Sequence, residues 1–151
     1  MVRLISKTNG GFLISKIKQI QGRVFGKLLT EHGIDQINGA QGRILFVLWN
    51  DDHIPIGELS GKTGLAKTTL TSMLDRLESS GHVKREYDSS DRRKVMIRLT
   101  ETAAQMKSRY EKVSAQMNDI FYEGFDDREI SAFEENLMRI LNNLSKKENL
   151  K

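Results

Sequence analysis

The spacing of the apolar residues changes abruptly at Gly81. Before this glycine the apolar residues recur at helical spacing, which predicts a helix over residues 67–80. After it, Val83, Arg85 and Tyr87 alternate with two charged residues, and Val95, Ile97 and Leu99 alternate with Met96 and Arg98. This period of two predicts two short strands, each with one buried face. The polar residues 88–94 between the strands are typical of a turn. We therefore expect a helix followed directly by a β-hairpin.

A shorter helix is predicted just before this one. Residues 57–63 place Leu59 on the same side as Ile56, and Thr63-Gly64-Leu65 then makes a tight turn. Two helices joined by a few residues that include glycine are typical of a helix-turn-helix. Because a hairpin in this position is called a wing, the sequence predicts a winged helix-turn-helix core.

The outward face of the helix over 67–80 is rich in small hydroxyl side chains. Hydroxyls can bind phosphates and several base edges, and threonine methyls can contact thymine methyls in the major groove. Such a face also occurs on proteins that bind nothing, but the wing directly downstream favours double-stranded DNA as the partner. The DNA-contacting residues predicted on this helix are Lys67, Thr68, Thr69, Thr71, Ser72 and Arg76.

The tip of the predicted hairpin carries three cations, Arg92, Arg93 and Lys94, in a chain with a formal net charge of +4. Arginine at such a tip can enter the narrow, negatively charged minor groove of A·T-rich DNA. We interpret these three residues as wing contacts to DNA. Asp88 and Asp91 are expected to pair with neighbouring arginines and to fix the shape of the loop. The alternative is a salt-bridged loop without a ligand.

Long amphipathic helices are predicted outside this core. Residues 12–29 form the first, Thr100 is a candidate N-cap for one that ends near Gly124, and residues 130–144 carry the apolar face of the last. A winged core has little use for such helices, so we expect them to pack against a second copy of the chain. A larger monomeric core is the alternative.

The fold class expected is therefore mainly α with a small β-hairpin wing (α+β). We expect one domain over residues 1–151. Within it, residues 38–100 form the DNA-binding lobe, and residues 1–37 and 101–151 supply the helices that make a homodimer. A buried central helix is predicted at about 39–50, with Asn38 as its candidate N-cap.

Signals of other functions are poor. The sequence has no cysteine, which excludes disulfides, thiolate metal sites and thiol redox chemistry. Its three histidines are far apart, and no zinc-protease, phosphate-loop or nucleophile-elbow motif is present. We expect no catalytic residues, no metal and no cofactor. No apolar run is long enough to span a membrane and no secretion signal is visible, so a cytoplasmic protein is expected.

The order of elements, together with a few local motifs, resembles the MarR family of bacterial and archaeal transcription regulators. The motifs are Gly57-Glu58-Leu59-Ser60 entering the helix-turn-helix, Leu74-Asp75-Arg76-Leu77-Glu78 with Gly81, Val83-Lys84-Arg85 on the first strand, the tip Asp88-Ser89-Ser90-Asp91-Arg92-Arg93, and Leu99-Thr100 opening the next helix. The resemblance covers about residues 14–144.

The resemblance implies a triangular homodimer in which each winged helix reads half of a palindromic operator. Thr68, Thr69 and Ser72 hold positions that face the major groove in relatives, and Arg92 or Arg93 holds the minor-groove position. Two departures are visible. The family often has arginine where this chain has Ser90, and serine or aspartate where it has Ala66, which weakens the N-cap of the recognition helix.

The resemblance also implies a small aromatic or phenolic effector that binds between the dimerisation helices and the DNA-binding lobe and weakens DNA binding. Met73, Arg76 and Arg85 are candidates to line that cleft, although Arg76 could equally bridge to an aspartate of the wing. The resemblance leaves open the operator sequence, the effector and the choice between repression and activation.

Two functions from different classes follow. The first is a dimeric, sequence-specific DNA-binding regulator, most simply a repressor. The second is a protein-interaction module that keeps the winged fold without reading DNA, which would require an acidic or bulky apolar recognition face.

Overall fold

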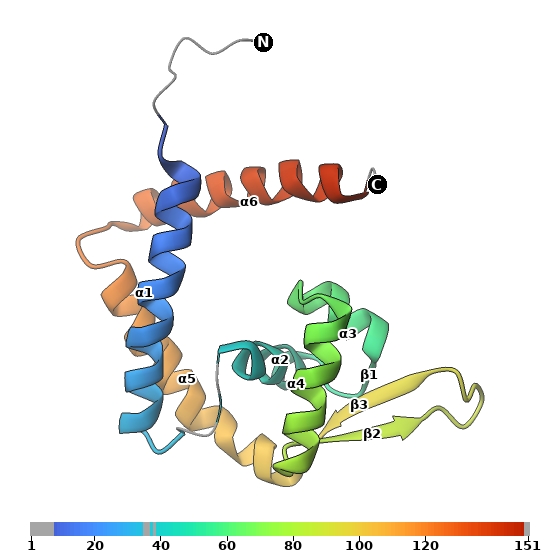
Figure 1. Ribbon diagram of the computed structural model, residues 1–151. Coiled ribbons are helices and arrows are strands. Elements are labelled where there is room, and N and C mark those ends of the chain that lie inside the picture. Colours follow the sequence, from blue (N-terminus) through green and yellow to red (C-terminus); the bar gives the residue numbers. More distant parts are fainter. Residues whose placement is uncertain (1–7, 35–36, 38, 150–151) are drawn as a thin grey trace. The chain divides into compact units, whose positions relative to one another are not determined.

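A computed structural model describes residues 8–34, 37 and 39–149 of the chain. The described residues form six helices and three strands, which Figure 1 labels. In chain order they are α1 (Gly10–Glu31), α2 (Gly39–Asn50), β1 (Ile54–Pro55), α3 (Ile56–Thr63), α4 (Lys67–Ser79), β2 (Val83–Tyr87), β3 (Val95–Leu99), α5 (Glu101–Phe121) and α6 (Asp127–Asn149). The mainly helical fold with a small wing is confirmed.

The wing is an antiparallel hairpin of β2 and β3, in which Arg85 lies opposite Ile97. The sequence did not predict the third strand, β1, which pairs with β3 and gives the sheet order β1-β3-β2. This strand has only two residues, and one of them is Pro55. Proline lacks an N–H to donate, and it is tolerated here because β1 is an edge strand.

Side chains and glycines set the helix ends much as expected. The α3 helix ends at Gly64, whose φ of 70° lies in the left-handed region that favours glycine. The hydroxyl of Thr100 accepts a hydrogen bond from the N–H of Ala103 at 3.3 Å, which confirms this residue as the cap of α5. The predicted cap at Asn38 lies outside the described residues.

The central helix α2 is buried on its core side, as predicted. Its Ile44, Leu45 and Leu48 have no exposed surface. They belong to the same core as the equally buried Leu59 of α3 and Leu74 of α4. Burial of such side chains supplies the main driving force for folding of the lobe.

A close approach between helices occurs at Gly42 of α2. A Cβ at this position would lie 2.6 Å from the hydroxyl oxygen of Tyr110, so only glycine fits without a shift. The ring of Tyr110 packs against Trp49 and Phe25, with centroids 4.9 and 5.6 Å away. Burial raises the pKa of the Tyr110 hydroxyl to about 12. The Trp49 indole N–H, in turn, donates to the Ala103 carbonyl at 3.0 Å.

The chain divides into two compact units, the first ending at Ser114 and the second beginning at Ala115. In the second unit, aromatic rings of Phe121, Tyr122, Phe125 and Phe133 pack around the turn between α5 and α6. The α6 helix begins with a reciprocal cap, since the Glu129 N–H donates to Asp126 at 2.9 Å and the Asp126 N–H to Glu129 at 3.1 Å. The predicted division into lobe and dimerisation helices stays a prediction.

Both outer helices leave apolar side chains exposed within their own units. The α1 helix exposes Phe12, Leu13, Ile14, Ile17 and Ile20, and the α6 helix exposes Met138, Ile140, Leu141 and Leu144. We call these sets the α1 stripe and the α6 stripe. Within the described residues, no helix is apolar over a stretch long enough to cross a bilayer.

Candidate nucleic-acid interface

The recognition helix α4 has one buried and one exposed face. Leu70, Leu74 and Leu77 are almost fully buried, and Met73 is half-buried. All six residues predicted to contact DNA on this helix are exposed on the other face: Lys67, Thr68, Thr69, Thr71, Ser72 and Arg76. The fold therefore fixes this helix by its leucine stripe and leaves the hydroxyl-rich face open.

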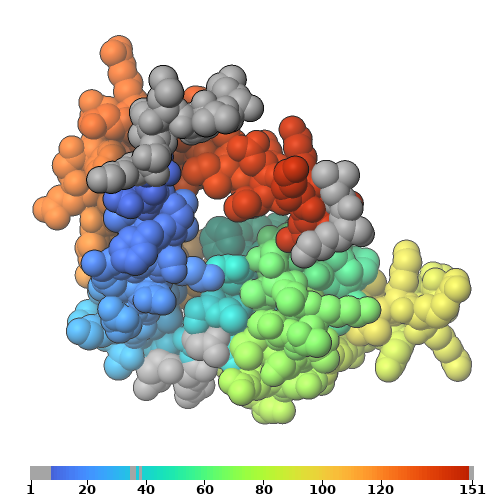
Figure 2. Space-filling view, turned by 45° about the horizontal axis from the view of Figure 1, so that its top comes forward, coloured from blue at the N-terminus to red at the C-terminus, as the bar shows by residue number. Residues whose placement is uncertain are grey.

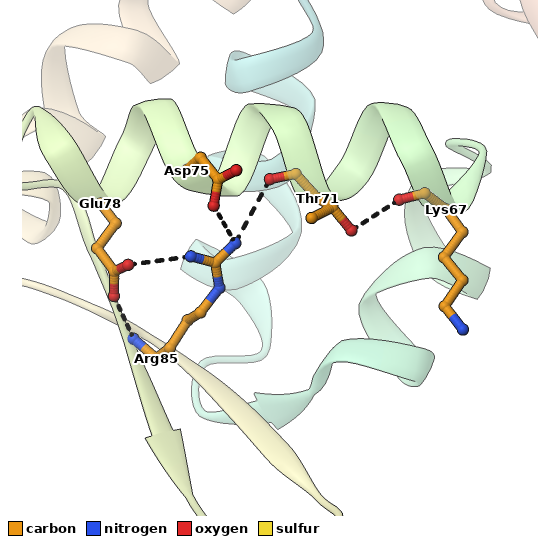
Figure 3. Close-up of polar contacts among 5 residues, drawn as sticks. All are labelled: Lys67, Thr71, Asp75, Glu78 and Arg85. Atoms are coloured by element: carbon orange, nitrogen blue, oxygen red, sulfur yellow. Dashed lines mark hydrogen bonds and ion pairs between the residues drawn. The ribbon is translucent and has the colours of Figure 1, made fainter.

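The hydroxyls on this face differ in their freedom to donate. The Thr71 hydroxyl donates to the Lys67 carbonyl of its own helix at 2.9 Å (Figure 3). A phosphate accepts but does not donate, so Thr71 is a poorer phosphate ligand than its neighbours. The hydroxyls of Thr68, Thr69 and Ser72 make no hydrogen bond to any residue that the structure describes.

The N-terminus of α4 has no side-chain cap. Ala66 holds the N-cap position with φ −62° and ψ 147°, and its side chain has no oxygen to accept a hydrogen bond. The first hydrogen bond of the helix runs from the Leu70 N–H to the Ala66 carbonyl at 2.8 Å. The N–H groups of the first turn therefore remain available to an external anion, which the helix dipole also attracts.

The wing tip, residues 88–94, is shaped by its own side chains. Asp91 accepts from the Arg93 main-chain N–H at 3.0 Å and from its guanidinium at 3.2 Å, as expected. Asp88, instead of pairing with an arginine, accepts from the Ser90 hydroxyl at 2.7 Å and main-chain N–H at 2.9 Å. The pKa of Asp88 is lowered, mainly by the hydrogen bond from the Ser90 hydroxyl. The pKa of Asp91 is also lowered, mainly by the hydrogen bond from the Arg93 side chain.

These contacts distinguish the three cations of the tip. Arg93 pairs with Asp91, although its side chain remains 91% exposed. Arg92 and Lys94 are exposed and make no ion pair with a described residue. The wing, drawn in yellow, projects beyond the green surface of α4 in Figure 2. Arg92 is accordingly the better candidate for a minor-groove contact.

Arg85 on β2 joins the wing to the recognition helix (Figure 3). Its guanidinium lies 2.8 Å from an Asp75 oxygen and 3.0 Å from a Glu78 oxygen, and it also donates to the Thr71 carbonyl at 3.4 Å. The main-chain N–H of Arg85 donates to the second oxygen of Glu78 at 3.1 Å. We call this set the Arg85 network. Sequence reasoning missed it, because no local pattern links the acids of α4 to a residue of β2.

The assignment of Met73, Arg76 and Arg85 to an effector cleft stays a prediction. Arg85 is engaged with α4, and the wing aspartates, to which Arg76 was the alternative candidate to bridge, are bonded within the wing. A cavity of about 220 Å³ lies elsewhere in the first unit, lined by Gly33, Ile34, His82, Thr102, Gln105, Met106 and Arg109.

His82 is the buried polar residue of that cavity. Its Nδ1 lies 2.6 Å from the Ser80 hydroxyl oxygen, and burial lowers the pKa of its ring. The ring is therefore neutral near pH 7. Among the residues that the structure describes, no three histidine, aspartate or glutamate side chains gather into a group suited to a metal ion.

The lobe just described matches known proteins. The sequence model of the MarR family matches residues 37–95, which contain α2 through the start of β3. The regulator YcgE of Bacillus subtilis, described as an uncharacterised HTH-type transcriptional regulator, is 41% identical over 115 residues, which are 70% of this chain and 75% of YcgE.

A second relative matches this chain over a smaller part of its own length. The HTH-type transcriptional regulator TtmR of Methylorubrum extorquens is 36% identical over 88 residues, or 58% of this chain. The match spans 44% of TtmR, less than half of that protein.

Among solved structures, a mutant of the E. coli MarR protein complexed with operator DNA has the same fold. Its TM-score is 0.78 at 27% sequence identity, with 87% of this chain and 92% of the other covered. The bound DNA is a property of that protein.

Proposed function

Because the chain belongs to the MarR family of transcriptional regulators, we propose that it binds a palindromic operator as a homodimer and represses transcription from it. In this proposal the N-terminal half of α4 enters the major groove, where Lys67, Thr68, Thr69 and Ser72 meet phosphates and base edges. Arg92 of the wing tip enters the adjacent minor groove, and Arg93 and Lys94 contact the backbone.

The observation that carries the proposal is that one lobe has two exposed surfaces rich in hydrogen-bond donors. The hydroxyl face of α4 and the cations of the wing tip are both exposed, while Leu70, Leu74 and Leu77 anchor the helix beneath. Nothing on this face is acidic before Asp75. The first two turns of α4 thus offer only donors, methyl groups and one positive charge to a polyanion.

Homodimerisation is supported by the α1 and α6 stripes. Single exposed apolar residues are ordinary, but a contiguous set along a helix marks an interaction surface. Two copies related by a two-fold axis would present two recognition helices to one face of the duplex, about 34 Å apart for half-sites one turn apart. A palindromic site is the DNA counterpart of that symmetry.

We also propose that a small aromatic acid or phenol releases the regulator from DNA. The cavity beside His82 is a candidate receptor for it, and Arg109 supplies a cation for a carboxylate. A thermal-shift panel of phenolic acids, repeated with Arg109→Gln, would test this part. Stabilisation that survives the substitution would place the effector elsewhere, and a flat panel would argue for a regulator without an effector.

The central experiment selects duplexes from a randomised pool with the wild-type protein, sequences them, and measures binding to the enriched duplex by fluorescence anisotropy at several salt concentrations. We expect a palindromic sequence and a steep loss of affinity with salt, because each phosphate contact releases counterions. The absence of any enriched sequence would favour the alternative, a winged-helix module that binds protein. A reporter gene behind the enriched site then distinguishes repression from activation.

A further inference from the structure

We infer that Arg85 is a positioning residue for DNA binding, which holds the wing at a fixed angle to the recognition helix. The inference rests on the proposed function, because it assigns a role within the same interface. It differs from the role that the sequence suggested for Arg85, which was to line an effector cleft.

The geometry of the network supports a clamp between two elements. Thr71, Asp75 and Glu78 lie on one face of α4, spaced four and three residues apart, and one guanidinium on β2 reaches all three. Glu78 is held at both oxygens, by the side chain and the main-chain N–H of Arg85. A carboxylate held in this way resists both sliding and rotation of the strand along the helix.

Arginine is required for this arrangement. Its planar fork presents several N–H donors in fixed directions, whereas the single ammonium of lysine cannot meet three acceptors that diverge along a helix. The side chain of Arg85 is 25% exposed, while those of Asp75 and Glu78 are 63% and 41% exposed, so the network lies at the surface and its value is the fixed geometry rather than shielding from water.

The angle between α4 and the wing matters because both must reach DNA at once. The chain between α4 and β2 is only three residues long and contains Gly81 with φ of 81°. This connection keeps β2 close to α4 but does not by itself fix the angle between them. The buried side chain of Val83 anchors the start of β2. Two residues further on, Arg85 supplies a second fixed point, and the two together define the direction in which Arg92 is carried.

A simpler role for Arg85 would be electrostatic. Asp75 and Glu78 place two negative charges beside the proposed DNA contacts, and Arg85 could merely offset them. The two roles predict opposite results for the double substitution Asp75→Asn with Glu78→Gln. Removing two negative charges should strengthen binding to any DNA if only charge matters. If the network positions the wing, binding to the preferred sequence should weaken.

The test uses the full-length chain and two probes, the duplex enriched by the wild-type protein and the same duplex with its sequence scrambled. We expect the double variant to bind the enriched duplex more weakly while it binds the scrambled duplex at least as well as wild type. Its specificity ratio should fall about tenfold, the loss expected from charge-assisted hydrogen bonds worth roughly 1.4 kcal/mol. Tighter binding to both duplexes at an unchanged ratio would overturn the inference.

Single substitutions supply the matched control. Arg85→Gln and Lys84→Gln remove the same charge from adjacent residues of one strand, and Lys84 is exposed and makes no ion pair with a described residue. Arg85→Gln should lower the specificity ratio and Lys84→Gln should not. Arg85→Lys keeps the charge and should recover only part of the loss. Equal effects at the two positions would assign Arg85 a charge role alone.

A measurement without DNA separates this inference from the proposed function. The main-chain N–H at position 85 is bonded to Glu78, so Glu78→Gln and Arg85→Gln should both accelerate its hydrogen exchange. Amides in the core, such as that of Leu48, should keep their wild-type rates. If the wild-type protein enriches no duplex, the proposed function fails, and this measurement still decides whether the clamp exists. An unchanged rate at position 85 would show that it does not.

Discussion

At the scale of single residues, the clearest constraint in the molecule is the contact between Gly42 and the hydroxyl of Tyr110. Gly42→Ala would place a methyl 2.6 Å from that oxygen, in a core where Tyr110 is buried against Trp49. Overpacking of this kind costs about 1–3 kcal/mol. We expect a matching loss in the free energy of unfolding, measured by urea denaturation with circular dichroism.

Gly61 of α3 is the control for that substitution. A Cβ there meets nothing within 4 Å, and its φ is not positive. Gly61→Ala should therefore stabilise the protein by about 0.5–1 kcal/mol, because alanine loses less backbone entropy in a helix. Equal stability of the two variants would mean that Tyr110 moves aside at no cost.

Arg92 and Arg93 are neighbours, yet the structure predicts different consequences for their loss. Arg92→Ala should weaken DNA binding and reduce the salt slope by about one, since one phosphate or groove contact disappears. Arg93→Ala should weaken binding less through direct contact, because its charge is shared with Asp91. Anisotropy titrations from low to moderate salt measure both quantities. Identical losses and slopes for the two variants would contradict this ranking.

At the scale of elements, the N-terminus of α4 lacks a side-chain cap. The backbone of Ala66 has the extended conformation of an N-cap but offers no acceptor to the first-turn N–H groups. Ala66→Ser should supply one and stabilise the protein by about 1 kcal/mol. The gain should appear as a higher urea midpoint with an unchanged slope. A destabilised Ala66→Ser variant would mean that the first turn needs its N–H groups free even without DNA.

The wing tip should depend on pH in a defined direction. The pKa values of Asp88 and Asp91 lie below their ordinary value of 3.8 in the folded wing. A depressed folded pKa stabilises the folded loop at pH values above the unfolded pKa, and this stabilisation is lost as pH falls through the folded one. We expect the amide resonances of Ser90 and Arg93 to shift together only below about pH 4, by NMR titration. Titration of these amides near pH 6 would contradict this assignment.

At this scale the sequence predicts well those elements that have a periodic or local pattern along the chain. The leucine stripe of α4, the hairpin and the Thr100 cap were all predicted, because periodicity and capping are local properties. Alternation also grouped Tyr87 with the buried Val83, and this was wrong, since Tyr87 is 73% exposed. Alternation predicts which face of a strand a residue lies on, but it does not predict how much of that face the core covers.

The other misses share the same physical cause. The strand β1 needs β3 as its partner, and Ile54 pairs with Ile97, far along the chain. Arg85 finds its acceptors only once β2 lies against α4. Neither contact has a sequence period. Of the candidate interface, the exposed residues of α4 and the wing were therefore predictable, whereas the residue that ties them together was not.

At the scale of the whole molecule, the proposed function requires two copies of the chain. The α6 stripe has no buried residue in the single chain, and Leu141 and Leu144 are 54% and 64% exposed. In a homodimer these side chains would lose their contact with water, which is worth about 25 cal/mol for each Å² of apolar surface. A charge placed among them would have to be buried without a partner.

Leu141→Asp should therefore shift the protein from dimer to monomer in sedimentation velocity at micromolar concentration, while far-ultraviolet circular dichroism stays unchanged. Asn142→Asp adds the same charge one residue along, on a neighbouring exposed position, and should remain dimeric.

The monomeric Leu141→Asp variant should also lose affinity for a two-half-site duplex by about a hundredfold or more, because the second half-site no longer binds as an intramolecular step. Its affinity for a single half-site should match that of wild type. A wild-type protein that sediments as a monomer would contradict the homodimer. A Leu141→Asp variant that stays dimeric with full affinity would remove the α6 stripe from the interface and leave the α1 stripe as the surface to test.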